Sequence, residues 1–313
     1  MHISHNTTND SDSWPDVNVA AWSGTKRSLH MYAQMLGKIR LALSPTQPNW
    51  MFTALYLSAR GVTTGFIPWE LSSLEARVDV FESRITVARS NGSRKHVALL
   101  PVRPVAEVYA DVSEALRGLG IECHISPIPQ EVPDTTPFDE DRRPSEYDPA
   151  AVSRCFRAFT ATAAVFERWR AHFFGRSSIA VWWGGFDVAL LLFSGKRVTP
   201  PTDRGYLVKY DLDAELMSVG LFLGDEQTAP FFYGYIFPEP PGAEQLAIRP
   251  PQATWSTQLR EWTLPYEAVR SSNDPKAMVA TFVDSIYAQC FAVASWNRDA
   301  LKYDGPKRPG NSN

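Results

Sequence analysis

Apolar residues recur along this chain with two periods, one typical of helices and the other of strands. After Pro104, the apolar residues Val105, Val108, Val112 and Leu116 follow at helical spacing and form one face of an amphipathic helix. Further helices are predicted over residues 19–36, 149–174 and 276–296.

Two Asp-Pro pairs mark predicted helix starts, at Asp148-Pro149 and Asp274-Pro275. An aspartate can cap a helix, and proline is tolerated at the first helical position. The helix over 276–296 is apolar nearly all round, so we expect it to be buried.

Short segments rich in strand-forming residues lie between these helices. They are predicted over 39–43, 51–58, 62–67, 84–89, 95–100, 122–125, 179–183, 186–193, 215–222, 231–237 and near 262–268. Asn91-Gly92 separates two of them and is typical of a type I′ hairpin turn. Runs of strands between helices, without strict alternation, favour an α+β fold with antiparallel meanders.

The order of these elements suggests an internal duplication. Each half is predicted as a helix, a glycine-plus-basic step, an aromatic-rich strand meander and a closing helix. The steps are Gly37-Lys38 in the first half and Gly175-Arg176 in the second. Self-similarity of this kind would set the architecture.

The domain boundaries follow from composition. The repeats are expected over 14–126 and 148–302, joined by a Pro-rich linker over 127–147 that should be extended and exposed. The tails over 1–13 and 303–313 are polar and are expected to be disordered.

The composition is that of an ordinary globular protein with an aromatic excess. The 313 residues include 10 Trp, 11 Tyr and 17 Phe, which indicate either a bulky core or an aromatic-lined ligand cavity. A net charge of −3 argues against nucleic acid as a partner. Neither a signal peptide nor a membrane-spanning segment is found, so we expect a cytoplasmic protein without a membrane partner.

Standard signatures of catalysis are missing. The chain lacks GxGxxG, GxxxxGK[ST], GxSxG and HExxH, and its three cysteines are scattered, which argues against a zinc ribbon or a disulfide framework. No cofactor is therefore expected.

Charged residues within apolar segments are the main candidates for chemistry. Asp187 interrupts an apolar strand, and a buried carboxylate needs a partner. It is either an ion-pair anchor, with Arg197 or Arg270 as partner, or an acid or base with a shifted pKa. Glu215 and Glu267 also lie beside aromatic strands, where charges are sparse.

Basic residues on the first helix and the strand predicted after it are further candidates. His30 is either a structural histidine or a group that moves a proton. Lys38 and Arg40 would point the same way on a strand, either toward an anionic ligand or toward solvent. The catalytic candidates are His30, Asp187, Glu215 and Glu267. The ligand-binding candidates are Lys38, Arg40, Asn49, Trp50, Trp183 and Tyr266.

A family resemblance is carried by residues spread over most of the chain. They include Trp22, Thr25, Leu29-His30, Gly37-Lys38-Ile39-Arg40-Leu41, Arg60-Gly61, Thr63-Thr64, Trp183-Gly184, Phe186-Asp187, Phe193-Ser194-Gly195, Pro238-Glu239-Pro240 and Leu264-Pro265-Tyr266-Glu267. Over residues 14–302 the chain resembles a divergent member of an uncharacterised bacterial family, a domain of unknown function.

The resemblance implies histidines at four positions where this chain has Asn49, Pro144, Ala180 and Ala214. Histidines with a carboxylate suit a divalent metal or acid–base chemistry. Their replacement implies that the family-type site has been dismantled or rebuilt, so we expect no family-type metal. Asn49 and Ala180 occupy equivalent places in the two halves, which would fit a pseudo-symmetric site between them.

Three hypotheses for the function remain open. We favour an enzyme that acts on a small molecule in a polar and aromatic cavity between the halves. The molecule could be anionic, and the reaction would not use the family-type metal. The second is a non-catalytic paralogue that binds a ligand in a pocket lined mainly by Trp, Phe and Ala. The third is an interaction protein with an exposed apolar patch. The reaction, the substrate and the oligomeric state stay open.

Overall fold

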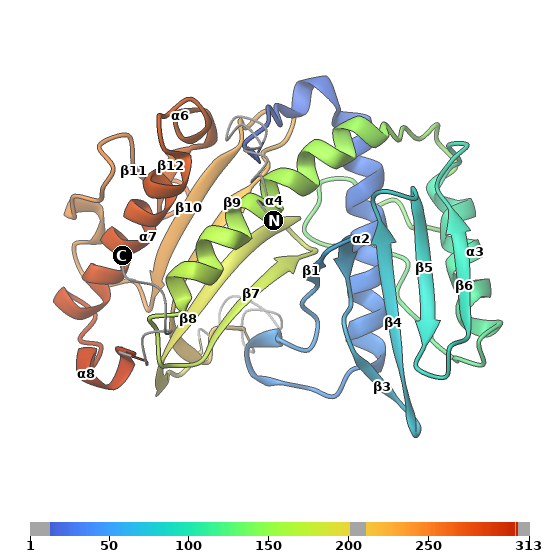
Figure 1. The fold of residues 1–313 in the computed structure, drawn as a ribbon, viewed down its shortest axis with the longest axis horizontal. Coiled ribbons are helices and arrows are strands. Elements are labelled where there is room, and N and C mark those ends of the chain that lie inside the picture. Colours follow the sequence, from blue (N-terminus) through green and yellow to red (C-terminus); the bar gives the residue numbers. More distant parts are fainter. Residues whose placement is uncertain (1–12, 201–210, 304, 306–313) are drawn as a thin grey trace, which may run out of the picture.

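Helix α2 (Ser23–Leu43) lies at the junction of two antiparallel sheets (Figure 1). The computed structural model describes residues 13–200, 211–303 and 305. The chain is an α+β protein, as predicted. In the described part, no helix is long and apolar enough to cross a bilayer.

The first sheet is a meander with the order β1-β2-β4-β5-β6, and β3 pairs with β4 beside β2. Its strands are β1 (Tyr56–Ser58), β2 (Gly61–Thr63), β3 (Ile67–Trp69), β4 (Ser72–Asp79), β5 (Arg84–Arg89) and β6 (Arg94–Ala98). Helices α2 and α3 (Val105–Arg117) pack on one face of this sheet and lie behind it in Figure 1.

The second sheet has the order β11-β12-β10-β9-β8-β7. Its strands are β7 (Ser177–Trp182), β8 (Asp187–Arg197), β9 (Ala214–Phe222), β10 (Phe231–Phe237), β11 (Thr254–Ser256) and β12 (Glu261–Pro265). Helices α4 (Pro149–Arg170) and α7 (Pro275–Ala292) cover one face of it, and the short helices α6 (Tyr266–Arg270) and α8 (Arg298–Leu301) flank α7 (Figure 1).

A backbone bridge between Leu55 and Val181 joins the two sheets. The amide nitrogen of Leu55 donates to the carbonyl oxygen of Val181 at 3.0 Å, and the amide nitrogen of Val181 donates back at 2.8 Å. The edge strands β1 and β7 therefore lie side by side (Figure 1).

The predicted helix starts are confirmed. The carboxylate of Asp148 accepts a hydrogen bond from Ala150 at the start of α4, and that of Asp274 accepts one from Ala277 at the start of α7. The prediction that the last helix is buried all round is wrong, because Asp284 and its neighbours on one face of α7 are exposed.

Several strand predictions are wrong, and the first has the largest effect. Residues 39–43 continue helix α2, because Met35, Leu36 and Ile39 extend its apolar face at helical spacing. Residues 122–125 form no strand, and the segment after Pro265 turns into α6. The glycine-plus-basic step is therefore helical at Gly37 but lies in a loop at Gly175, and the internal duplication stays a prediction.

The hairpin at Asn91-Gly92 is confirmed, but its turn is of another type. Gly92 has a positive φ of 89°, and its amide donates to the carbonyl of Arg89, whereas Asn91 is not in the left-handed region. A turn followed by one left-handed glycine makes a three-residue loop, which suits the strand twist as well as a type I′ turn does.

The linker over 127–147 contains no helix or strand, but it is not exposed throughout. Phe138, Asp141 and Tyr147 are buried. Their burial makes the linker part of the core between the halves. Of the tails predicted over 1–13 and 303–313, residues 1–12, 304 and 306–313 lie outside the described residues.

We predict that Gly37→Ala lowers the free energy of unfolding by about 1–3 kcal/mol, although alanine is the better helix former. A Cβ at Gly37 would overlap the indole ring of Trp183, whose Nε1 donates to the carbonyl of Thr53 at 3.0 Å and so fixes the ring. Chemical denaturation measures the effect. In a Trp183→Phe background the same substitution should cost less, and an equal cost in both backgrounds would contradict the overlap.

Candidate functional site

Four polar side chains form a stripe along the buried side of helix α2. Lys26, His30, Gln34 and Lys38 follow at intervals of four residues, which places them along one side of the helix. All four are buried. We call them the α2 stripe.

His30 is held by the turn between β7 and β8. Its Nε2 lies 2.8 Å from the carbonyl oxygen of Trp183 and 3.0 Å from that of Gly184, so we assign the ring proton to Nε2. The ring stacks on Phe186 at 5.2 Å. Burial, with the nearby charge of Lys26, lowers the pKa of His30 to about 4, so the ring is neutral near pH 7.

Gln34 fixes the linker against the helix. Its side-chain nitrogen donates to the carbonyl of Gln130 at 2.6 Å, and its oxygen accepts from the amide of Gln130 at 2.9 Å. The next residue, Glu131, has a positive φ of 57° and places its carboxylate over Gly184, where a Cβ would collide with it. The linker is thus fastened to both halves.

The two lysines of the stripe have no ion-pair partner among the described residues, although the charge of Asp225 acts on Lys26 at longer range. In the described part of the chain, neither Lys26 nor Lys38 makes an ion pair or a hydrogen bond through its ammonium group. The ammonium of Lys26 lies 5.7 Å from the ring centre of Phe222, and that of Lys38 lies 5.6 Å from the ring centre of Trp183. Burial lowers the pKa of both lysines, that of Lys38 to about 8.

A cavity of about 550 Å³ opens at the N-terminal end of the stripe. Its walls include Lys26 and His30 from α2, Asp134 and Arg143 from the linker, and Asp225 from the loop after β9. It therefore lies where the first half, the linker and the second half meet. We call it the α2 cavity.

A closed ion-pair network borders the α2 cavity. Arg27 and Arg143 both bind Asp141, which is buried, and Arg143 also binds Asp134 at 2.7 Å. These guanidinium groups lower the pKa of Asp141 against the effect of its burial. The charges of this network balance one another, so among the described residues of the wall Lys26 is the cation that has no ion pair, with Asp225 acting on it only at longer range.

Asp187 lies at the start of β8 on the other side of the β7–β8 turn. It pairs with neither arginine predicted for it, and instead accepts a hydrogen bond of 2.6 Å from the hydroxyl of Tyr233. Burial raises the pKa of Asp187 to about 7, and the charge of Glu131 adds to the shift. The second interpretation of Asp187, an acid with a shifted pKa, is the one the contacts support.

The other predicted catalytic carboxylates lie elsewhere. Glu215 accepts a hydrogen bond from Ser194 at 2.7 Å, and it is seven residues along β9 from the residue that pairs with Asp187, roughly 20 Å away. Glu267 is exposed on α6 and pairs with Arg270 at 2.9 Å. The structure does not bring Asp187, Glu215 and Glu267 together.

The predicted orientation of Lys38 and Arg40 is wrong, because positions two apart on a helix point in different directions. Arg40 donates to the carbonyl oxygens of Phe52 and Thr64, which ties α2 to the segments around the first strands. This guanidinium therefore has a structural role.

The remaining ligand-binding candidates make contacts within the protein. Tyr266 donates to the carbonyl of Pro15 at 3.0 Å, and Trp50 stacks on Phe52 at 5.2 Å. Asn49 is fully buried, donates to the carboxylate of Asp213 at 2.6 Å and accepts from Arg176.

Three positions for which the resemblance implies a histidine fall near one face of the second sheet. The cross-strand pairing puts Ala180 beside Ala189, and Ala189 shares the face of Leu216 and Ala214. Asn49 reaches this edge through Asp213. Among the described residues, no group of His, Cys, Asp and Glu could hold a metal ion.

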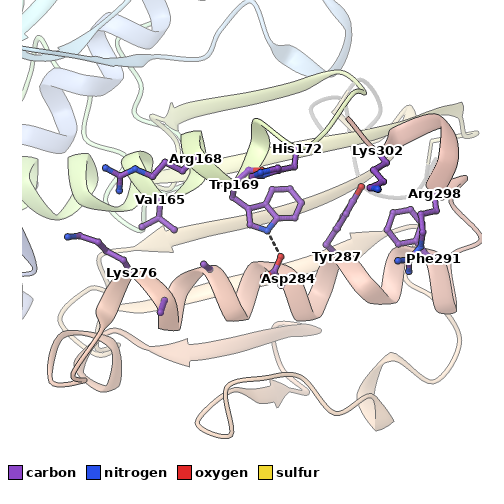
Figure 2. A pocket seen from close by; sticks show the side chains of 12 residues that line it. Val165, Arg168, Trp169, His172, Lys276, Asp284, Tyr287, Phe291, Arg298 and Lys302 are labelled. Atoms are coloured by element: carbon purple, nitrogen blue, oxygen red, sulfur yellow. Dashed lines mark hydrogen bonds between the residues drawn. The ribbon is translucent and has the colours of Figure 1, made fainter. Parts of the chain in front are cut away.

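A second cavity, of about 570 Å³, lies between α4, α7 and α8 (Figure 2). Trp169 and Tyr287 form its apolar wall with Phe291, and Trp169 donates to Asp284 at 2.6 Å. Its charged side chains, all exposed, are Arg168, His172, Lys276, Asp284, Arg298 and Lys302. Because buried titratable groups mark functional sites better than exposed ones, the α2 cavity is the stronger candidate.

A comparison with known protein families shows to which family the chain belongs. The model of a family of unknown function (DUF5996) matches residues 14–303. The chain belongs to this family. No curated protein and no solved structure matches it. Because the match spans both halves and the linker, the α2 cavity lies within the DUF5996 region.

Sequence reasoning missed Lys26, Glu131 and Tyr233. Lys26 could have been found, because it lies one helical turn before His30 on the same side of α2. Glu131 lies in the linker and Tyr233 in an aromatic strand, and neither carries a local signal of its contact with Gly184 or Asp187.

We predict that Asp187→Asn stabilises the protein at pH 8 by roughly 1–3 kcal/mol and changes its stability little at pH 4. The folded-state pKa of about 7 lies above the ordinary value of 3.8, so the stability contributed by protonated Asp187 is lost as the pH rises through 7. Asparagine keeps an acceptor for Tyr233 and removes the charge.

Chemical denaturation at both pH values measures this difference. Glu267→Gln, which removes an exposed carboxylate, serves as the control and should lack the effect. Destabilisation by Asp187→Asn at pH 8 would contradict a raised pKa.

Proposed function

We propose that this DUF5996 protein binds a small anionic molecule in the α2 cavity, with Lys26 as the counter-charge. The observation that carries the proposal is the buried Lys26 ammonium in the cavity wall, which forms no ion pair among the described residues, although the charge of Asp225 acts on it at longer range. A buried charge is costly unless it is paired, so a ligand anion would supply the missing partner.

Most other charges in the wall are already engaged, and Glu226, which also lines the cavity, adds a further negative charge. Arg27 and Arg143 are held by Asp134 and Asp141. Asp225 accepts from the backbone nitrogens of residues 227 and 228 at 2.8 and 2.7 Å, so its carboxylate shapes the loop. These groups favour a preformed cavity, which lowers the cost of ordering on binding.

The protonation state of His30 suits a role in ligand binding better than a role as a catalytic base. With the proton on Nε2, its Nδ1 is a hydrogen-bond acceptor. A general base works best with a pKa near the operating pH, and the pKa of His30 is about 4. The neutral ring therefore suits recognition of a donor group on the ligand. Binding without catalysis by His30 is the function that the geometry supports best.

One observation favours an enzyme as the second candidate. Burial lowers the pKa of Lys26, which increases the share of free amine near neutral pH. A free amine can add to a carbonyl carbon, and loss of water then leaves an iminium ion. Borohydride would reduce that adduct, and mass spectrometry would locate it on Lys26 if the ligand carries a reactive carbonyl.

We predict that Lys26→Met weakens binding of the small carboxylates that raise the melting temperature of the wild-type protein. Loss of a charge-assisted contact weakens binding by about tenfold or more. The same substitution removes an unpaired buried charge, so the melting temperature without ligand should stay equal or rise.

Thermal shift and titration calorimetry with a panel of small organic anions measure both effects. Lys95→Met, which removes an exposed lysine on β6, is the matched control. Because binding needs the ammonium form, affinity should fall as the pH rises through the lowered pKa of Lys26. Unchanged binding by Lys26→Met would exclude the proposal.

A further inference from the structure

The first sheet has an outer face that α2 and α3 do not cover (Figure 1). On this face, Arg77 of β4 pairs with Thr86 of β5, which pairs with His96 of β6. Residues directly opposite one another on neighbouring strands project from the same face. Arg84 and Arg94 precede Thr86 and His96 by two positions, so they share that face.

These side chains surround a cavity of about 350 Å³. Its lining consists of Arg60, Arg77, Asp79, Arg84, Thr86, Arg94 and His96. We call it the outer arginine pocket. It is separate from the α2 cavity, with which it shares no lining residue.

The outer arginine pocket has more positive charge than its acidic groups can balance. Asp79 is engaged by Arg60, at 2.6 Å, and by the backbone amides of Phe81 and Glu82. Within the described chain, neither Arg84 nor Arg94 forms an ion pair with a carboxylate.

Two guanidinium groups also hold unused hydrogen-bond donors. The Nε atoms of Arg77 and Arg84 are buried and have no acceptor. A buried donor without a partner costs free energy, and most such groups in folded proteins are satisfied. The strands that carry these side chains are paired along their length, so the backbone positions from which the arginines project are fixed.

We propose that the outer arginine pocket binds the phosphoryl group of a small phosphorylated molecule. Guanidinium groups match the geometry of phosphate oxygens and bind them in pairs. A tetrahedral dianion can accept from several arginines at once. This site is independent of the anion site proposed at Lys26.

The surroundings favour a small molecule over a nucleic acid. Glu75 lies 3.3 Å from Arg77, and Glu82 lies 3.4 Å from Arg60, so carboxylates border the pocket on two sides. An extended polyanion would meet these carboxylates as well as the net charge of −3 of the whole chain. A single phosphoryl group is small enough to contact the arginines without meeting these carboxylates.

His96 provides a spectroscopic readout at the pocket. Burial and the charges of Arg84 and Arg94 lower its pKa, while Asp79 opposes them, and its Nδ1 lies 3.1 Å from the hydroxyl of Thr86. A phosphate dianion bound among the arginines would offset their charge. The pKa of His96, followed by NMR, should therefore rise when phosphate binds.

The test titrates the full-length protein with inorganic phosphate and pyrophosphate, by calorimetry and by NMR of His96. Arg84→Gln and Arg94→Gln should each weaken binding by about tenfold. Lys95→Gln is the matched control, because Lys95 neighbours Arg94 in sequence but pairs with Val87 and belongs to the inner face. Lys26→Met should leave the phosphate-induced change in the pKa of His96 unchanged, because His96 lines this pocket and not the α2 cavity, and this readout separates the two sites.

Arg84→Lys adds a second test that keeps the charge, and it should bind phosphate more weakly than the wild type because the paired donors are lost. Equal weakening by Lys95→Gln would show general surface attraction and overturn the site. Absence of phosphate binding, or an unchanged His96 pKa, would do the same. Tighter binding of RNA or of anionic vesicles, lost in the same variants, would overturn the small-molecule assignment.

Discussion

The burial of helix α2 on all sides is the constraint on which the rest of the structure depends. Every residue from Ser28 to Arg40 is buried, and several of them are polar. A polar group inside a protein must find a partner or raise the free energy of the folded state. The linker, the β7–β8 turn and the segment around Phe52 supply backbone carbonyls to His30, Gln34 and Arg40. The two halves and the linker thus pack where they can supply hydrogen-bond partners to the buried polar groups of α2.

The same constraint separates structural from functional groups along α2. Arg40 and Gln34 are satisfied by backbone groups, so their burial is explained by the fold alone. Among the described residues, Lys26 and Lys38 form no ion pair, and an aromatic ring lies near each ammonium group. An aromatic face stabilises a cation, but less than an ion pair does in a buried place. Lys26 also lines a cavity, and this combination distinguishes it from the other polar residues of the helix.

Local patterns predicted the elements that depend on local chemistry. The capped starts of α4 and α7, the amphipathic α3 and strand β10 were read directly from Asp-Pro pairs and apolar spacing. The end of α2 was missed because Gly37 was taken as a break. Inside the protein that glycine is required by the Trp183 ring, which only the tertiary structure places there. The sequence indicated His30 and Asp187 as unusual, but their partners come from segments more than 40 residues away.

Family membership extends over the whole of this arrangement, yet it assigns no chemistry to it. The backbone bridge between Leu55 and Val181 has a second consequence, because it covers a sheet edge. Strand β7 ends the second sheet, and an uncovered sheet edge can pair with other chains. In the intact protein β1 and its neighbouring loop lie against that edge. Each half therefore shields the other from intermolecular strand pairing, and a chain shortened to its second half would expose an aggregation-prone edge.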